Sequence, residues 1–194
     1  CRALIDDDQL SIDEINEKYI FGPDFPTGGL ILGRAGIHQA YHTGRGSVVM
    51  RGKTSFEEVR KDRQAIIIHE VPYQVNKARM VEIIAEVVRD KRIEGISDLR
   101  DESDRKGVRV VVELKRSAEP EVVLAQLFRF TPLQSSFGVN MLALHRGQPQ
   151  LMNLKQIITA FVEFREEVIR RRTIHELGRA REKAHMLAGL AVAV

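Results

Sequence analysis

The chain has 194 residues, with 30 Lys or Arg, 27 Asp or Glu and a formal net charge of +3. Its 43% hydrophobic content is ordinary for a globular protein, and no apolar run is long enough to span a bilayer, which excludes a membrane-spanning class. A single cysteine, Cys1, excludes an internal disulfide, and the apolar residues 3–5 run into three aspartates rather than into a signal peptide. We therefore expect a cytoplasmic protein with one good-sized domain and an appendage.

Charge is unevenly distributed along the chain. Residues 1–27 hold two Lys or Arg against seven Asp or Glu, residues 28–154 hold twenty against fifteen, and residues 155–194 hold eight against five. An acidic head and a basic remainder indicate one face that binds a polyanion and another that avoids it.

Residues 1–27 are expected to form a short helix and a rigid connector. Ser11 and Glu14 have the spacing of a capping box, in which each side chain satisfies a main-chain N–H at the start of a helix. The helix ends before Gly22, and residues 23–27 (PDFPT) are extended because each proline restricts itself and the residue before it.

Residues 28–53, which we call the basic ledge, are the stretch around which the chain is organised. They predict an apolar strand, a tight turn, a short helix, a second turn and a second apolar strand. Residues 25–56 contain no Asp or Glu but include four cations: Arg34, Arg45, Arg51 and Lys53. This pattern favours contact with a polyanion. The alternative is a solvated basic surface whose counter-charges come from elsewhere in the fold.

The following residues alternate between strands and helices. Hydrophobic periodicity predicts, in chain order, a charged hairpin tip at 54–63, a buried strand at 65–71, an amphipathic helix at 75–92, strands at 96–100 and 108–115, a helix at 120–130 and a strand at 139–145. The order β-α-β-β-α-β is that of a ferredoxin-like split β-α-β unit, although order alone does not fix the pairing.

Residues 154–194 contain no proline, which predicts one long helix of ~60 Å. Apolar residues recur every three or four positions in two runs of different phase, Leu154, Ile157, Phe161, Phe164 and Val168, then Leu177, Ala180, Ala184, Leu187, Ala191 and Val194. Such a seam is typical of a coiled coil whose partner helix lies elsewhere, so we expect a piece of a larger protein. The arginines at 170–172 fall between the runs and are expected to be solvated, with contact to nucleic acid or a partner helix as the alternative.

These elements together predict an α+β fold. It consists of a ferredoxin-like β-α-β-β-α-β body, an extra basic β-α-β ledge and a long C-terminal α-helix. The predicted parts are residues 1–27, 28–150 and 151–194.

His38 and His42 lie four residues apart on the predicted short helix and could in principle clamp a metal ion. No carboxylate or thiol lies nearby in sequence to supply a third ligand. We therefore expect no metal site, and expect polar contacts from these side chains to main chain or phosphate.

The acidic run 98–104 (DLRDESD) lacks the ligand spacing of a calcium loop. Arg100 lies inside it and Arg105 directly follows it, so an ion-paired turn is expected.

For catalysis, the sequence contains no G-x-S-x-G, Walker loop, H-E-x-x-H or usefully spaced Cys/His pair. By itself the chain is not expected to be an enzyme.

Several long motifs occur in order along the chain: GPDFPT (22–27), GRAGI (33–37), TGRGSV (43–48), HEVPYQVNKARMVE (69–82), EGISDLRDESD (94–104), LQSSFGVNMLALHRGQP (133–149) and RRRTIHEL (170–177). Together they resemble the A subunits of bacterial DNA gyrase, a family of type IIA DNA topoisomerases. The resemblance covers essentially the whole chain. SFGVNMLAL and YQVNKAR are more similar to gyrase than to the A subunit of topoisomerase IV.

The resemblance implies a tower domain followed by the first part of a coiled-coil arm. In this family the tower holds the outer arms of the bent gate DNA during ATP-dependent negative supercoiling by double-strand passage. Implied partners are double-stranded DNA, a second A subunit in an A2B2 assembly, and the B subunit. No cofactor is implied for this stretch, because ATP and Mg²⁺ are bound by the B subunit.

The family's nucleophile is a tyrosine directly after an arginine. That dyad is absent from this chain, whose tyrosines have other predecessors: Tyr19 follows Lys18, Tyr41 follows Ala40 and Tyr73 follows Pro72. No catalytic residue is therefore assigned here, and the chain alone is expected to be inactive.

Charge pattern and resemblance together predict a set of phosphate-contacting residues: Arg34, Arg45, Arg51 and Lys53, with His38 and His42 nearby and Lys77 and Arg79 as weaker candidates. Three alternatives are a fragment of a topoisomerase IV A subunit, a purely structural lever arm, and a module that docks the B subunit without touching DNA.

Overall fold

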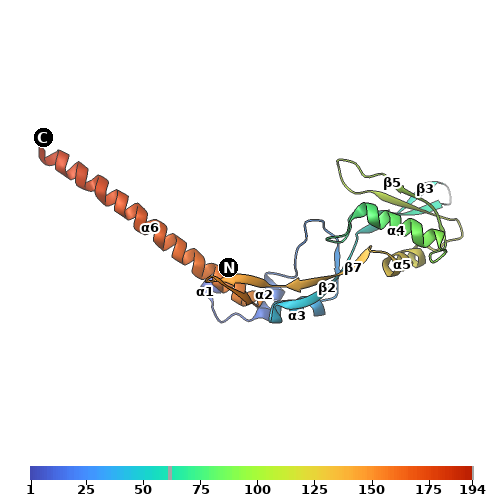
Figure 1. The fold of residues 1–194 in the computed structure, drawn as a ribbon, viewed down its shortest axis with the longest axis horizontal. Helices are drawn as coiled ribbons and strands as arrows, with labels where there is room; N and C mark the ends of the chain where they lie inside the picture. The colour runs from blue at the N-terminus through green and yellow to red at the C-terminus, as the bar shows by residue number, and fades with distance from the viewer. Residues whose placement is uncertain (61–62, 194) are drawn as a thin grey trace.

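The computed structural model describes residues 1–60 and 63–193. Its elements are, in order, α1 (Arg2–Asp6), α2 (Ile12–Lys18), β1 (Leu30–Leu32), α3 (Ala35–Thr43), β2 (Arg45–Arg51), β3 (Thr54–Arg60), β4 (Arg63–Ile68), α4 (Lys77–Arg89), β5 (Ile96–Asp101), β6 (Val110–Leu114), α5 (Pro120–Phe130), β7 (Gln134–Asn140), β8 (Leu142–His145), β9 (Gln148–Leu151) and α6 (Leu154–Ala193). The molecule is elongated, with the ledge between a globular body and α6 (Figure 1). The predicted α+β fold with a long C-terminal helix is confirmed.

The body is a four-stranded antiparallel sheet in the order β3-β4-β6-β5. Strands β4 and β5 flank β6 and are joined through α4, which is the predicted split β-α-β unit. Most of the predicted hairpin tip at 54–63 is strand β3, and positions 61–62 lie outside the described residues. One face of the sheet and helices α4 and α5 enclose the main core, whose fully buried members include Ile66, Ile68, Met80, Ile84, Val112 and Leu127.

The last strand of the predicted ferredoxin-like order lies elsewhere. The predicted strand at 139–145 spans two strands, β7 and β8, and β7 pairs with β2 of the ledge rather than with β4. The sheet edge beside β4 is instead occupied by β3, its neighbour in sequence. The break between β7 and β8 falls at Met141, whose N–H donates to the carbonyl of Gly44 at 2.8 Å while its own carbonyl accepts from Met152 at 3.1 Å.

The basic ledge is built from β1, α3 and β2, with β7 completing a three-stranded antiparallel sheet in the order β1-β2-β7. Helix α3 packs closely on β2 because Gly36 and Gly46 carry no side chains. A Cβ atom on Gly46 would lie 2.8 Å from the main-chain nitrogen of Ala40, and one on Gly36 would overlap the carbonyl of Ser47. The core beneath α3 contains buried residues from α2, α3, β2 and the start of α6: Ile15, Ile37, Ala40, Tyr41, Val48, Met50 and Leu154.

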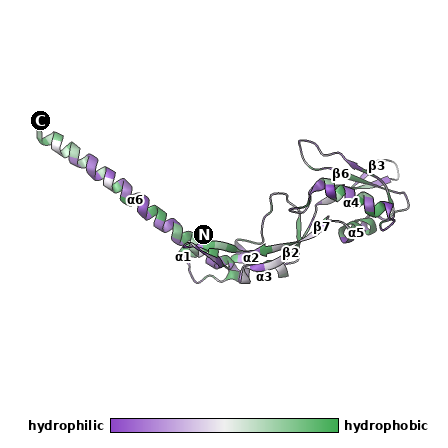
Figure 2. Cartoon of the chain, in the orientation of Figure 1, coloured by the Kyte–Doolittle hydropathy of each residue, from purple (hydrophilic) through white to green (hydrophobic). Residues whose placement is uncertain are grey.

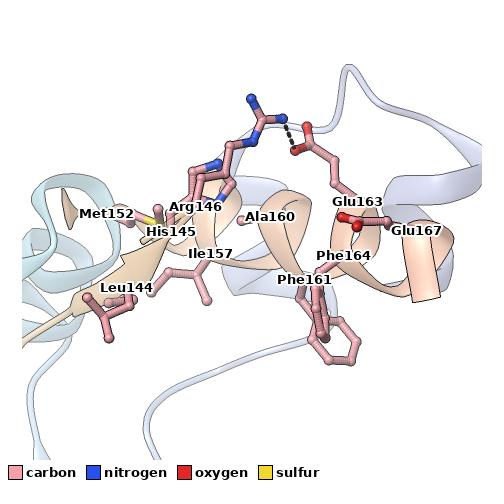
Figure 3. Close-up of a pocket in the computed structure, with 11 residues that line it drawn as sticks. Leu144, His145, Arg146, Met152, Ile157, Ala160, Phe161, Glu163, Phe164 and Glu167 are labelled. Carbon is pink, nitrogen blue, oxygen red and sulfur yellow. Dashed lines mark ion pairs between the residues drawn. The ribbon is translucent and has the colours of Figure 1, made fainter. Parts of the chain in front are cut away.

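Helix α6 leaves the ledge as one unbroken helix of 40 residues, which is ~60 Å long. Near its start it forms one wall of a groove of about 510 Å³ against the β8–β9 hairpin, with Phe161 and Phe164 on the helix and Leu144 on the hairpin (Figure 3). An ion pair of 3.5 Å between Arg146 and Glu163 bridges the two walls.

Hydrophobic positions recur along α6 beyond this groove, where the helix extends away from the other elements (Figure 2). Leu177 and Leu187 of the predicted seam are exposed, and Val194 lies outside the described residues. Helix α6 runs without a break through the arginines at 170–172, which are exposed; Arg171 and Arg172 form ion pairs with glutamates one turn away. None of the helices in the described part of the chain combines the length and the hydropathy needed to cross a membrane.

Candidate nucleic-acid interface

Two arginines flank helix α3 at the surface of the ledge. Arg34 is the residue that precedes the helix, and Arg45 follows Gly44, which ends the helix in a left-handed conformation with φ 77°. Both arginines are exposed, and among the described residues neither forms an ion pair with a carboxylate. Helix α3, nine residues and about 14 Å long, lies between them. Two free cations at this spacing can contact separate phosphates of one polyanion.

His38 and His42, on the same helix, are already engaged. Their rings stack with centroids 4.1 Å apart, and both Nε2 atoms lie close to Oδ1 of Asp13, at 3.2 and 2.9 Å respectively. The hydrogen bond from His42 is the main cause that lowers the pKa of Asp13. The sequence offered no sign of this partner, because Asp13 belongs to α2 and comes 29 residues before His42.

Arg51 and Lys53, at the far end of the ledge, differ in their surroundings. Arg51 is half-buried, its Nε donates to the side-chain oxygen of Gln134 at 2.7 Å, and its guanidinium lies 4.4 Å from the ring centroid of Phe128. Lys53 is exposed, with its Nζ 3.9 Å from a carboxylate oxygen of Glu70. Arg51 is therefore part of the packing between ledge and body, whereas Lys53 remains accessible.

Lys77 and Arg79 lie on α4 in the body, away from α3 (Figure 1). Lys77 forms a 2.6 Å ion pair with Asp101, and this interaction is the main cause that lowers the pKa of Asp101 to about 2. Arg79 pairs with two glutamates of its own helix, at 3.0 and 3.4 Å. The structure thus gathers Arg34, His38, His42 and Arg45 around α3 and does not bring the two α4 residues to them.

The acidic run 98–104 is ion-paired, as the sequence predicted, but its first four residues belong to strand β5 rather than to a turn. Arg100 contacts Asp98 at 2.7 Å and Glu102 at 3.2 Å, and it also reaches the buried Glu113 on β6 at 3.1 Å. Arg109, which the sequence did not single out, joins Glu102 to Glu57 on β3. These contacts give the run a structural role in the body sheet.

Two of the tyrosines are placed as structural residues. Tyr41 is buried in the ledge core, and burial raises the pKa of its hydroxyl. Tyr73 packs against Phe25 and Phe137, with ring centroids 5.3 and 5.6 Å away.

The family of the chain follows from comparison with known proteins. Residues 1–194 match the family of DNA gyrase/topoisomerase IV A subunits, and the chain belongs to this family of type IIA DNA topoisomerase subunits. The resemblance inferred from the motifs is therefore confirmed.

Similar curated proteins include several DNA gyrase A subunits. That of Granulibacter bethesdensis is 62% identical over 192 residues, that of Escherichia coli strain K12 is 57% identical over 195, and that of Rickettsia typhi is 57% identical over 194. The matches cover 99–100% of this chain but only 20–22% of the relatives. The chain thus spans about a fifth of the length of the relatives it matches.

Proposed function

We propose that this chain is the part of a DNA gyrase A subunit that helps to hold and bend the gate DNA segment during ATP-dependent negative supercoiling by double-strand passage. The observation that carries the proposal is the pair of exposed cations, Arg34 and Arg45, that flank α3 without carboxylate partners among the described residues. Such contacts position a duplex without reading its sequence, and they offset the energy of bending it.

The predicted contact residues differ in how readily they can reach phosphate. Arg34 and Arg45 are the principal contacts. Lys53 adds a weaker one because a carboxylate oxygen of Glu70 already lies near its Nζ. That pair is loose, at 3.9 Å, so Lys53 can still reach phosphate. The remaining candidates would have to exchange a partner for phosphate, since each already has a short polar contact: His38, His42, Arg51, Lys77 and Arg79.

The proposal extends to the assembly. In the complete enzyme the partners are double-stranded DNA, a second A subunit in an A2B2 arrangement, and the B subunit, all in the bacterial cytoplasm. ATP and Mg²⁺ are bound by the B subunit, so no nucleotide chemistry is assigned to this chain. The chain alone does not cleave DNA, because none of its tyrosines follows an arginine.

The test is the affinity of the 194-residue chain for a duplex of ~30 base pairs across a salt series. Each phosphate contact contributes ~0.9 to the slope of log affinity against log salt, so Arg34→Ala and Arg45→Ala should each reduce the slope by ~0.9 and the double variant by ~1.8. Arg181→Ala, an exposed arginine far along α6, is the matched control and should leave the slope unchanged.

Circular dichroism establishes that each variant is folded. A folded double variant with the wild-type slope would contradict the proposed contacts. It would favour one of the two other roles, a lever that transmits motion through the rigid helix α6 or a docking module for the B subunit.

A further inference from the structure

Three metal-ligand side chains from two helices converge at the surface of the ledge. One ligand atom from each of Asp13, His38 and His42 lies within 4.8 Å of the other two. From this convergence we propose that the three residues form a solvent-open site for a divalent transition-metal cation, with Zn²⁺ as the best match. The site uses neither Arg34 nor Arg45, the principal proposed contacts with DNA.

The histidine pair is oriented by the packing of α3. Ile37 and Tyr41 are buried four residues apart and fix which face of the helix meets the core. His38 and His42 are the next residues of the same helical stripe, so they lie side by side at the edge of the core, facing α2. Their rings are stacked 26° from parallel, with both Nε2 atoms next to the same carboxylate oxygen. Two histidines at this spacing on one helix face are a recurring zinc-binding arrangement.

The third ligand is held in place by its own helix. Asp13 lies in the first turn of α2, where Ser11 and Glu14 form the complete capping box, and Ile15 anchors the helix in the ledge core. Zinc ligands lie about 2.0–2.2 Å from the ion, so two ligands in a tetrahedron are about 3.3 Å apart. The observed separations from Asp13 Oδ1 are 3.2 and 2.9 Å, and all three ligand atoms lie within 4.8 Å of one another, so small shifts of the rings admit an ion.

The donor set selects the class of cation. Imidazole nitrogens favour Zn²⁺, Ni²⁺ and Cu²⁺, whereas Mg²⁺ and Ca²⁺ prefer oxygen ligands. The side chains of Asp13 and His38 are more than half exposed, which leaves room for water at the remaining coordination position. A bound ion would fasten α2 to the ledge, and it would withdraw both histidines from contact with phosphate.

The test is calorimetric titration of the full 194-residue chain with Zn²⁺. It is carried out on a Cys1→Ser background, because the exposed thiol of Cys1 is itself a zinc ligand. One equivalent of Zn²⁺ should bind, Co²⁺ should show the visible absorption of a tetrahedral site, and Mg²⁺ should not compete. Loss of a residue that only hydrogen-bonds to a metal ligand lowers metal affinity about 10–100-fold. Loss of a ligand itself should cost more, so Asp13→Asn, His38→Gln and His42→Gln should each weaken zinc binding by at least about 100-fold.

His175→Gln and His185→Gln, on exposed positions of α6, are matched controls and should leave the affinity unchanged. Unaltered affinity in a folded His38→Gln/His42→Gln double variant, or no stoichiometric zinc binding by the parent chain, would overturn the proposal. If a variant does not fold, ring resonances of the parent chain decide the question. Zinc must shift those of His38 and His42 and leave that of His175 in place.

Discussion

The carboxylate of Glu70 accepts a hydrogen bond of 2.6 Å from the main-chain N–H of Gly29, 41 positions earlier in the chain. Glu70 follows β4 of the body, and Gly29 precedes β1 of the ledge. The other carboxylate oxygen lies 3.9 Å from Nζ of Lys53, in the short connection between β2 and β3. One side chain therefore fixes the ledge to the body at the place where the chain passes between them.

Replacing Glu70 by Ala should lower the free energy of unfolding by about 1–3 kcal/mol, because the N–H of Gly29 loses a charged acceptor in a half-buried position. Glu70→Gln keeps an acceptor oxygen for this N–H and loses only the carboxylate charge, including the distant pair with Lys53, so it should cost less than Glu70→Ala, about 1 kcal/mol or below. Urea unfolding measures both, with Glu58→Ala on the exposed side of β3 as control. Equal losses in the two Glu70 variants would show that the charge, not the hydrogen bond, is the stabilising contribution.

Gly46→Ala should destabilise the ledge by about 1–3 kcal/mol, because the added methyl would lie 2.6 Å from the carbonyl oxygen of Gly36 and force α3 away from β2. Displacement of α3 also moves Arg34 and Arg45, so affinity for the duplex should fall with stability. Gly138→Ala is the matched control: it lies in the same sheet, on β7, and a Cβ there meets no atom within 4 Å. Thermal unfolding should show little loss in that variant, and a comparable loss would contradict the close-packing argument.

Acid should weaken the body through Asp101. Its pKa is lowered from 3.8 to about 2 by the ion pair with Lys77 and hydrogen bonds from Ser103, so the folded state binds its proton less readily than the unfolded state. The contribution of Asp101 to the free energy of unfolding is therefore complete above about pH 4 and is lost as pH falls through about 2. Both side chains are roughly one-third exposed, so the contribution is no more than about 1 kcal/mol.

Titration of the Asp101 carboxyl by NMR checks this directly. Lys77→Met should return the pKa of Asp101 toward 3.8. The free energy of unfolding should then fall less between pH about 4 and about 2. Lys106→Met, at an exposed position in the neighbouring turn, should leave both unchanged. A pKa that stays near 2 without Lys77 would assign the shift to the Ser103 hydrogen bonds instead.

Local patterns were sufficient to predict most elements of the fold but not the pairing of β7. Helix α5 begins and ends where its proline and apolar periodicity place it, and the capping box of α2 is complete. The polar residues Gln134, Ser135 and Ser136 carry no strand signal of their own. They form a strand because β2 lies beside them, with Met50 opposite Ser135 and Ser47 opposite Gly138. Pairing of this kind depends on tertiary contact and is invisible to periodicity.

The candidate site was predictable to the same degree. The absence of Asp and Glu from residues 25–56 pointed to the ledge and its arginines, because that charge pattern lies within one continuous segment of the sequence. The pattern could not reveal that Asp13, on a separate helix, meets the histidine pair, or that Arg51 lies over Phe128. Distance along the chain conceals both relationships, and packing of α2 and α5 creates them.

Arg51 and Arg34 should therefore give opposite results when each is replaced by Ala. Arg51→Ala removes a 2.7 Å hydrogen bond to Gln134 and a guanidinium 4.4 Å from the Phe128 ring, so it should lower the free energy of unfolding by about 1–2 kcal/mol. The salt slope of duplex binding should stay unchanged. Arg34→Ala should reduce that slope by ~0.9 and leave unfolding within about 0.5 kcal/mol of the parent. Urea unfolding and the salt series, run on both variants, separate a packing arginine from a phosphate contact. A lower slope with unchanged stability in Arg51→Ala would place Arg51 among the phosphate contacts.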